Sequence, residues 1–173
     1  MKRFLKIALP IFIPIAIMAV IFIGIFGVNK KNTAMKPVPI RWGEDTCVRC
    51  DMSIVDGYHA AEIINPITKK TYKFDDIGCA VLWLLKDHKF KWAKKGVIWV
   101  TSAKNGKWLN AKKACWVEGQ ITPMGFGFGA YETKPKDVKQ CIPWKDVVKS
   151  IFKKEKKFEE ALYGFNTQAK FVG

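Results

Sequence analysis

The longest hydrophobic stretch of the chain runs from Ile7 to Val28, and none of its residues is charged. It follows a basic start, and it is long enough for a full bilayer crossing, which takes about 20 residues. The apolar core of a cleaved signal peptide is shorter, roughly 7–15 residues, and ends at a small-residue cleavage site. No Ala-x-Ala site follows Val28. We therefore interpret residues 1–28 as an N-terminal transmembrane anchor, with a cleaved signal as the alternative, and residues 29–39 as a linker.

Short runs of β-branched and aromatic residues follow the linker. Two of them, residues 59–64 and 71–74, flank a turn-forming segment and so predict a β-hairpin. A helix is predicted from Asp76 to about Asp87, with Asp75 as its N-cap. These elements form a strand–strand–helix unit.

A second set of elements is predicted farther along the chain. Its strand candidates are residues 97–102, 108–110, 114–117 and 126–131. The dipeptide Asn105-Gly106 is a strong turn signal between the first two of these strands. From Trp144 onward, apolar residues recur at the spacing of an amphipathic helix, which we expect to begin after Pro143 and to end at Gly164.

The pattern after the linker is that of an α+β body, residues 40–173, with two small units at about 40–91 and 92–173. The net charge of the chain is +15, and basic residues flank the hydrophobic stretch on both sides, so the charge bias across it is weak. The order at the N-terminus, basic residues followed by an apolar run, is that of a signal sequence. It therefore favours an orientation with the N-terminus in the cytoplasm. We expect a single-pass protein of the inner (cytoplasmic) membrane with its C-terminal body in the periplasm. No nucleic-acid partner is expected, because the chain has no nucleic-acid-binding motif.

Three sulfur side chains stand close together in the segment Cys47-Val48-Arg49-Cys50-Asp51-Met52. Thiolates and thioethers are soft ligands that favour Cu(I), whereas a thioether adds little to a Zn(II) site. In an extended chain, Cys50 and Met52 would face the same side. Cys47 would join them if the chain turned back. This spacing favours a Cu(I) site.

Other interpretations of the motif stay open. A Cys-x-x-Cys pair also occurs in thiol–disulfide oxidoreductases, although their motif opens a helix in a βαβ unit. A structural zinc site needs four ligands, and no second ligand pair with tight spacing is visible. The five cysteines leave an odd one if the others pair, and spacing alone does not decide whether Cys115 and Cys141 form a disulfide.

Several further residues have both a structural and a functional interpretation. Cys79 lies in the first turn of the predicted helix, where a helix N-terminus favours the thiolate, but a small core residue is the preferred interpretation. Met124 stands in a glycine-rich stretch that can present its thioether at a surface. His59 can supply an imidazole or be solvated. No catalytic triad or carboxylate pair is recognisable, so an enzyme is not expected.

Three motifs together resemble the NosL family, accessory proteins of nitrous oxide reductase. They are Cys47-x-x-Cys50-x-Met52, then Tyr72-Lys73-Phe74-Asp75-Asp76-Ile77-Gly78-Cys79 followed by Trp83, and Thr122-Pro123-Met124-Gly125-Phe126-Gly127. The chain departs from the family in three ways. It has no lipid-attachment cysteine, Asp51 stands where glycine is usual, and Cys115 and Cys141 are extra.

The resemblance implies a Cu(I) metallochaperone that delivers copper to apo nitrous oxide reductase in denitrification, with a body of two related ββαβ-like units. It implies Cys50 and Met52 as copper ligands, with Met124 and Cys47 as further contributors. The partners expected are the apo reductase or its membrane-bound maturation machinery. Three alternatives remain: delivery of copper to another cuproenzyme such as a terminal oxidase, a thiol–disulfide oxidoreductase that uses Cys47 and Cys50, and a copper sensor or scaffold in a larger membrane assembly that binds copper without passing it on.

Overall fold

The computed structural model describes Met18 and residues 34–169, with side chains through residue 162. The predicted anchor and the first part of the predicted linker lie outside the described residues, apart from Met18. Among the helices described, none has both the length and the apolar character that a membrane crossing needs. Residues 32–173 form one compact unit, separate from residues 1–31.

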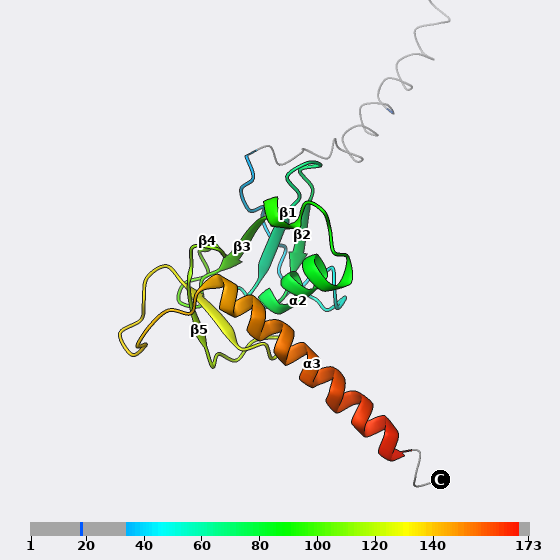
Figure 1. The fold of residues 1–173 in the computed structure, drawn as a ribbon. Helices are drawn as coiled ribbons and strands as arrows, with labels where there is room; N and C mark the ends of the chain where they lie inside the picture. Colours follow the sequence, from blue (N-terminus) through cyan, green and yellow to red (C-terminus); the bar gives the residue numbers. More distant parts are fainter. Residues whose placement is uncertain (1–17, 19–33, 170–173) are drawn as a thin grey trace, which may run out of the picture. The chain divides into compact units, whose positions relative to one another are not determined.

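The described body is a mixed fold of antiparallel sheets with a long C-terminal helix (Figure 1). Its elements in chain order are β1 (Ala61–Ile64), β2 (Thr71–Phe74), α2 (Ile77–Leu82), the π-helical turn η1 (Trp83–Asp87), the 3₁₀ turn η2 (Ala93–Lys95), β3 (Val97–Thr101), β4 (Trp108–Asn110), β5 (Cys115–Glu118), β6 (Phe128–Tyr131) and α3 (Trp144–Ala169). The strands and helices therefore lie close to where the hydrophobic pattern predicts them.

The main sheet has four antiparallel strands in the order β2-β1-β3-β4. Strand β1 is central and pairs with β2 on one side, where Ala61 faces Phe74, and with β3 on the other, where Ala61 faces Val100. Every residue of β1 is buried, as expected of a strand with neighbours on both edges. Strands β1 and β2 come from residues 40–91, and β3 and β4 from residues 92–173. The two predicted segments thus share one sheet.

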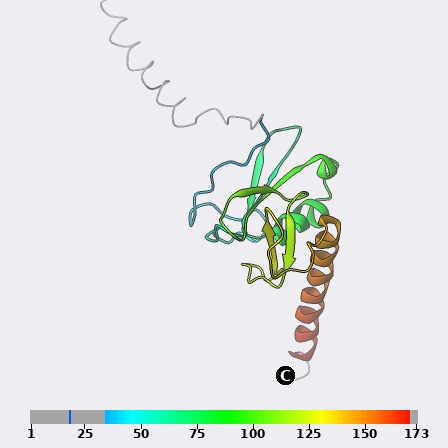
Figure 2. The ribbon, with the colours of Figure 1, turned by 90° about the vertical axis from the view of Figure 1, so that its left-hand side faces the viewer.

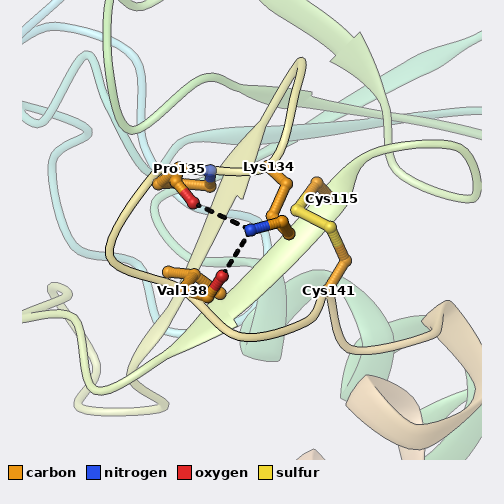
Figure 3. The surroundings of a disulfide bond; sticks show 5 residues. All are labelled: Cys115, Lys134, Pro135, Val138 and Cys141. Atoms are coloured by element: carbon orange, nitrogen blue, oxygen red, sulfur yellow. Dashed lines mark hydrogen bonds between the residues drawn. A yellow bond between two sulfur atoms is a disulfide. The ribbon is translucent and has the colours of Figure 1, made fainter.

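The second sheet is the antiparallel pair β5 and β6. A disulfide between Cys115, at the start of β5, and Cys141 ties this sheet to the segment that leads into α3, with the two Cα atoms 5.0 Å apart. Figure 3 shows the loop that the disulfide closes, in which Lys134 Nζ donates a hydrogen bond to the carbonyl oxygen of Val138 at 2.6 Å. A disulfide typically stabilises a fold by about 2–4 kcal/mol. This pairing removes two of the five cysteines from any metal chemistry.

Helix α2 packs between the main sheet and α3, and both views of the body place α2 and α3 on the same side of that sheet (Figures 1 and 2). The hydrophobic core of the described part extends from Ile40 to Ile151 and includes Trp116 and Phe126. Because this core and the disulfide both lie within residues 32–173, we expect that segment to fold on its own.

Helix α3 is longer than the sequence predicts. Its apolar face contacts the core through Val147 and Ile151, which are fully buried. The helix then continues through Gly164 to Ala169, although Gly164 was the predicted end. A glycine inside a helix costs about 1 kcal/mol relative to alanine, which weakens a helix without ending it. The second half of α3 extends past the strands in both views.

One buried carboxyl group makes the stability of the body depend on pH. Glu62 in β1 is fully buried; its Oε2 accepts a hydrogen bond from the Val38 amide at 2.9 Å, and its Oε1 has no partner among the described residues. Burial raises the pKa of Glu62 from 4.5 to about 7. The ammonium group of Lys73, the cross-strand neighbour of Glu62, is bound 2.6 Å from Asp45 and so compensates little.

We expect the free energy of unfolding to fall as the pH rises from about 4.5 to about 7. In that window folded Glu62 keeps a proton that the unfolded chain has lost, so the native state binds more protons and raising the pH favours unfolding. Glu62→Gln should remove the contribution of Glu62 to this dependence, but not that of Asp76, whose pKa burial also raises, and should raise stability at pH 8 by about 1–3 kcal/mol. Urea unfolding at pH 5 and pH 8 measures both effects. Glu132→Gln, at an exposed position, is the control, and equal behaviour of the two variants would contradict the prediction.

Candidate metal centre

The segment from Cys47 to Met52 forms a tight turn. The amide of Cys47 donates to the carbonyl oxygen of Met52 at 2.8 Å, and the amide of Asp51 donates to that of Cys47 at 3.0 Å. Asp51 has a φ of 59°, in the left-handed region that Asp tolerates better than most residues. The extended path on which Cys50 and Met52 would face one side is therefore not formed. The turn instead brings Cys47 and Cys50 together.

Neighbouring elements of the main sheet and of α2 bring two more ligand groups to this turn. The Val48 amide donates to the carbonyl oxygen of Lys73 at 3.0 Å, which fixes the turn against β2. Strand β2 ends at Phe74, so the next residue, Asp75, enters the same region with only 2% of its surface exposed. Cys79 follows in the first turn of α2 and is fully buried.

These contacts assemble a cluster of four residues, Cys47, Cys50, Asp75 and Cys79, which we call the thiol cluster. One ligand atom from each lies within 4.8 Å of all the others. The thiol of Cys50 donates to Asp75 Oδ2 at 3.5 Å. Cys50 is half-buried, whereas the other three are buried, so the cluster faces solvent through Cys50. The cluster contains all the cysteines that the disulfide leaves free.

The thiols influence one another's protonation. A hydrogen bond from the Cys79 thiol lowers the pKa of Cys47 to about 7, against the opposing effect of burial. The same interaction, together with burial, raises the pKa of Cys79. Burial also raises the pKa of Cys50, to about 12. Above about pH 7 the metal-free cluster therefore holds one thiolate, that of Cys47, and two protonated thiols beside a carboxyl group.

The chemistry of this cluster fits a bound cation. Asp75 Oδ1 is buried and has no hydrogen-bond partner among the described residues. A buried carboxylate oxygen without a partner is costly, and a metal ion would satisfy it. A cation would also offset the mutual repulsion of several thiolates. Thiolate-rich sites select Cu(I), Zn(II) or iron–sulfur clusters.

The two adjacent aspartates have different roles from those predicted. The N-cap of α2 is Asp76 and not Asp75, because Asp76 Oδ1 accepts a hydrogen bond from the Gly78 amide at 2.8 Å. Asp76 Oδ2 also accepts hydrogen bonds from the Thr122 hydroxyl at 2.6 Å and from the Met124 amide at 3.3 Å. Asp76 thus holds the Thr-Pro-Met-Gly loop against α2, which leaves Asp75 for the thiol cluster. Burial raises the pKa of Asp76.

The other candidate ligands predicted from the sequence are Met52, Met124 and His59. The side chain of Met52 is 49% exposed, and Met124 is half-buried against the core. Their roles as copper ligands stay predictions. His59 is not in the cluster, and its Nδ1 lies 2.6 Å from Asp56 Oδ2.

Arg49, between the two motif cysteines, connects the turn to distant parts of the chain. Its Nε lies 2.9 Å from Asp87 Oδ2 at the end of η1, and its Nη2 lies 2.6 Å from Glu155 Oε1 on α3. These side chains are largely buried, with 19% of Arg49 and 13% of Glu155 exposed. Helix α3 therefore helps to hold the turn that carries Cys47 and Cys50.

Gly78 allows the aromatic ring of Phe126 to cover the first turn of α2. A Cβ atom at Gly78 would lie 2.1 Å from a carbon of that ring, which is buried. We expect Gly78→Ala to destabilise the metal-free body by at least about 2 kcal/mol, because an added methyl group in a packed core forces its neighbours to move. Urea unfolding measures the loss.

Gly57→Ala is the matched control for this substitution. Its Cβ atom would meet nothing closer than 3.9 Å, an ordinary contact with Trp42. A similar stability for the two alanine variants would contradict the close approach of Phe126 to α2.

The chain has similarity to known proteins among solved structures, but not among family models or curated proteins. No protein-family model matches the chain, and no curated protein matches it. Among solved structures, the fold is similar to the crystal structure of the copper chaperone NosL from Shewanella denitrificans, with 20% sequence identity and a TM-score of 0.46. The similar region covers 68% of this chain and 87% of that one. That protein bears the name of the family that the sequence motifs resemble.

Proposed function

We propose that this protein is a Cu(I) metallochaperone whose cargo binds at the thiol cluster. The observation that carries the proposal is the convergence of Cys47, Cys50 and Cys79, the three cysteines outside the disulfide, on a buried carboxylate. Thiolates suit Cu(I). The single half-buried member, Cys50, gives an acceptor protein a route by which its own ligands can replace those of the cluster one at a time.

The setting of the chaperone is part of the same proposal. The hydrophobic stretch Ile7–Val28 would tether it to the cytoplasmic membrane with its body in the periplasm, and tethering would raise its effective concentration near membrane-bound partners. The acceptor that the motifs favour is apo nitrous oxide reductase or its maturation machinery, with another cuproenzyme as the alternative. Met52, exposed beside the cluster, and Met124 are the thioethers proposed to take part in copper binding or transfer.

The oxidoreductase alternative fits the geometry less well. The motif lies in a turn and not at the start of a helix, and Cys47, the thiol of lowered pKa, is fully buried. A substrate disulfide must reach the attacking thiolate. The more accessible Cys50 has a raised pKa and would be protonated at neutral pH.

A structural Zn(II) site is the second candidate function. Three cysteines and an aspartate are four ligands, the number that a tetrahedral zinc site takes. The sequence alone disfavoured zinc because no second ligand pair was visible, and the cluster supplies that pair as Asp75 and Cys79. For a structural zinc site, removal of the metal would strongly destabilise the body.

An anaerobic titration of the reduced body, residues 32–173, tests both candidates. Cu(I) is titrated against bathocuproine disulfonate and Zn(II) against a fluorescent zinc chelator, and unfolding is measured with and without each metal. The proposed function predicts one sulfur-coordinated Cu(I) per chain, bound more tightly than Zn(II), and transfer to apo nitrous oxide reductase on mixing. The structural site would be favoured instead by two results together. Zn(II) would bind tightly and not be displaced by Cu(I) supplied as its bathocuproine complex, and removal of Zn(II) would unfold the body.

A further inference from the structure

A cavity of about 360 Å³ opens beside α2, η1, β3 and the first half of α3. Its volume lies in the range of small-molecule sites, roughly 300–1,000 Å³. Its lining is mainly apolar: Val81, Leu84, Leu85, Ala93, Ile98, Trp144 and Val148. No residue of the thiol cluster or of the turn that carries it lines this cavity, so the cavity is a separate site from the candidate metal centre.

Four lysines complete the lining: Lys94, Lys112, Lys145 and Lys149. No aspartate or glutamate is among the described residues that line the cavity. Lys112 Nζ donates to the backbone oxygens of Lys94, at 3.2 Å, and of Gly96, at 3.4 Å, which fix its position without neutralising it.

One carboxylate lies near these lysines, that of Asp146, 3.4 Å from Lys149 Nζ. Both side chains of this pair are more than half exposed, and such pairs contribute little. The rim of the cavity therefore keeps a positive charge.

An apolar cavity with a cationic rim is complementary to a molecule that has an apolar chain and an anionic head. Lysines extend their aliphatic stems along apolar surface and keep the ammonium group in water, where it can meet such a head group. A peptide backbone would fit poorly, because its amide and carbonyl groups would lose hydrogen bonds in an apolar lining. A cationic amphiphile would be repelled at the rim.

We propose that this cavity binds a single-chain anionic amphiphile, with the chain among the apolar residues and a carboxylate or phosphate among the four lysines. The size of the cavity favours one alkyl chain over the two chains of a bilayer phospholipid. A protein held at a membrane surface would meet such molecules. The proposal does not depend on copper binding.

Fluorescence of 11-(dansylamino)undecanoate tests the proposal on the body, residues 32–173, purified without detergent. We expect saturable binding of one probe per chain and displacement by dodecanoate, with dodecyltrimethylammonium at least tenfold less effective. Lys145→Glu with Lys149→Glu should weaken probe binding at least tenfold. The matched control is Lys153→Glu with Lys157→Glu, which makes the same change of charge on exposed positions of α3 outside this cavity and should have little effect.

Val148→Trp supplies an independent test, because the larger side chain should fill the cavity and reduce probe binding while the lysines remain. If that variant does not fold, the comparison of the two lysine double variants still tests the proposal. Equal displacement by the cationic amphiphile, or equal weakening by both lysine pairs, would overturn the proposal. Displacement by phosphatidylglycerol vesicles but not by dodecanoate would also overturn it, in favour of a membrane surface as the ligand.

Discussion

Replacing Cys79 by serine should weaken Cu(I) binding at least about 100-fold, because removal of a direct ligand exceeds the 10–100-fold typical of outer-shell partners. Cys79 is buried in the first turn of α2, with its sulfur within 4.8 Å of ligand atoms of Cys47, Cys50 and Asp75. Cys50→Ser should cause a loss of similar size. Competition with bathocuproine disulfonate under anaerobic conditions measures both affinities.

A double variant that removes the disulfide is the control. It shows whether replacing cysteine by serine outside the thiol cluster changes Cu(I) affinity. Cys115→Ser with Cys141→Ser should cost about 2–4 kcal/mol of stability and leave the Cu(I) affinity of the folded body unchanged. Cu(I) binding by a folded Cys79→Ser variant at the level of the unaltered protein would show that Cys79 is a core residue. That is the interpretation that the sequence alone favours.

Local pattern was sufficient to predict most strands. The runs at 71–74 and 108–110 coincide with β2 and β4, because alternating or β-branched residues between turn signals specify an extended segment without reference to the rest of the chain. The pairing of β1 with β3 was not predicted. It joins segments about 36 positions apart, from Ala61 with Val100 to Ile64 with Val97, and no local signal reports such a contact.

The candidate site was predictable in part for the same reason. Cys47 and Cys50 are close in sequence, and one turn brings them together. Asp75 and Cys79 join them through the attachment of that turn to β2, which only the folded chain displays. Asp75 and Asp76 are equally good N-cap residues by type, and the choice between them depends on the contact of Asp76 with Thr122, 46 positions away.

The motif that carries the family resemblance gives evidence for Cys79 as a candidate ligand, and composition does not. Cys79 closes the motif that begins at Tyr72, in which Asp75 and Asp76 precede Gly78. The structure assigns a separate reason to three of these positions: a carboxylate for the thiol cluster, a cap for α2, and space for Phe126. Each of these positions has its own structural or chemical requirement. The place of Cys79 at the end of this motif was therefore better evidence for a ligand than its place in a predicted helix was for a core residue.

Cu(I) affinity should rise steeply with pH. Cysteine binds metal as the thiolate, so each protonated thiol must release its proton when copper binds. Near pH 8, Cys47 is ionised because its pKa is lowered to about 7, whereas Cys50, with a pKa raised to about 12, and Cys79, also raised, still hold their protons. Two protons are then displaced per copper ion, and raising the pH favours binding.

The expected slope follows from proton linkage: each proton released changes the affinity about tenfold per pH unit, so affinity should rise about 100-fold per unit between pH 7.5 and 9. Below about pH 6.5 Cys47 is protonated as well, and the slope should approach about 1,000-fold per unit. Affinities at several pH values, corrected for protonation of the competitor, measure this slope, and calorimetry in two buffers counts the protons released.

The slope also separates a three-thiol site from a two-thiol site. If Cys79 is a ligand, Cys79→Ser should remove one displaced proton and reduce the slope from about 1,000-fold to about 100-fold per pH unit below about pH 6.5, where Cys47 is protonated whether or not the Cys79 thiol lowers its pKa. Cys115→Ser with Cys141→Ser should leave it unchanged, because neither residue belongs to the cluster. If the Cu(I) affinity of the unaltered protein rises only tenfold per pH unit near pH 8, copper displaces a single proton there. The site would then consist of the Cys47 thiolate and one further thiol.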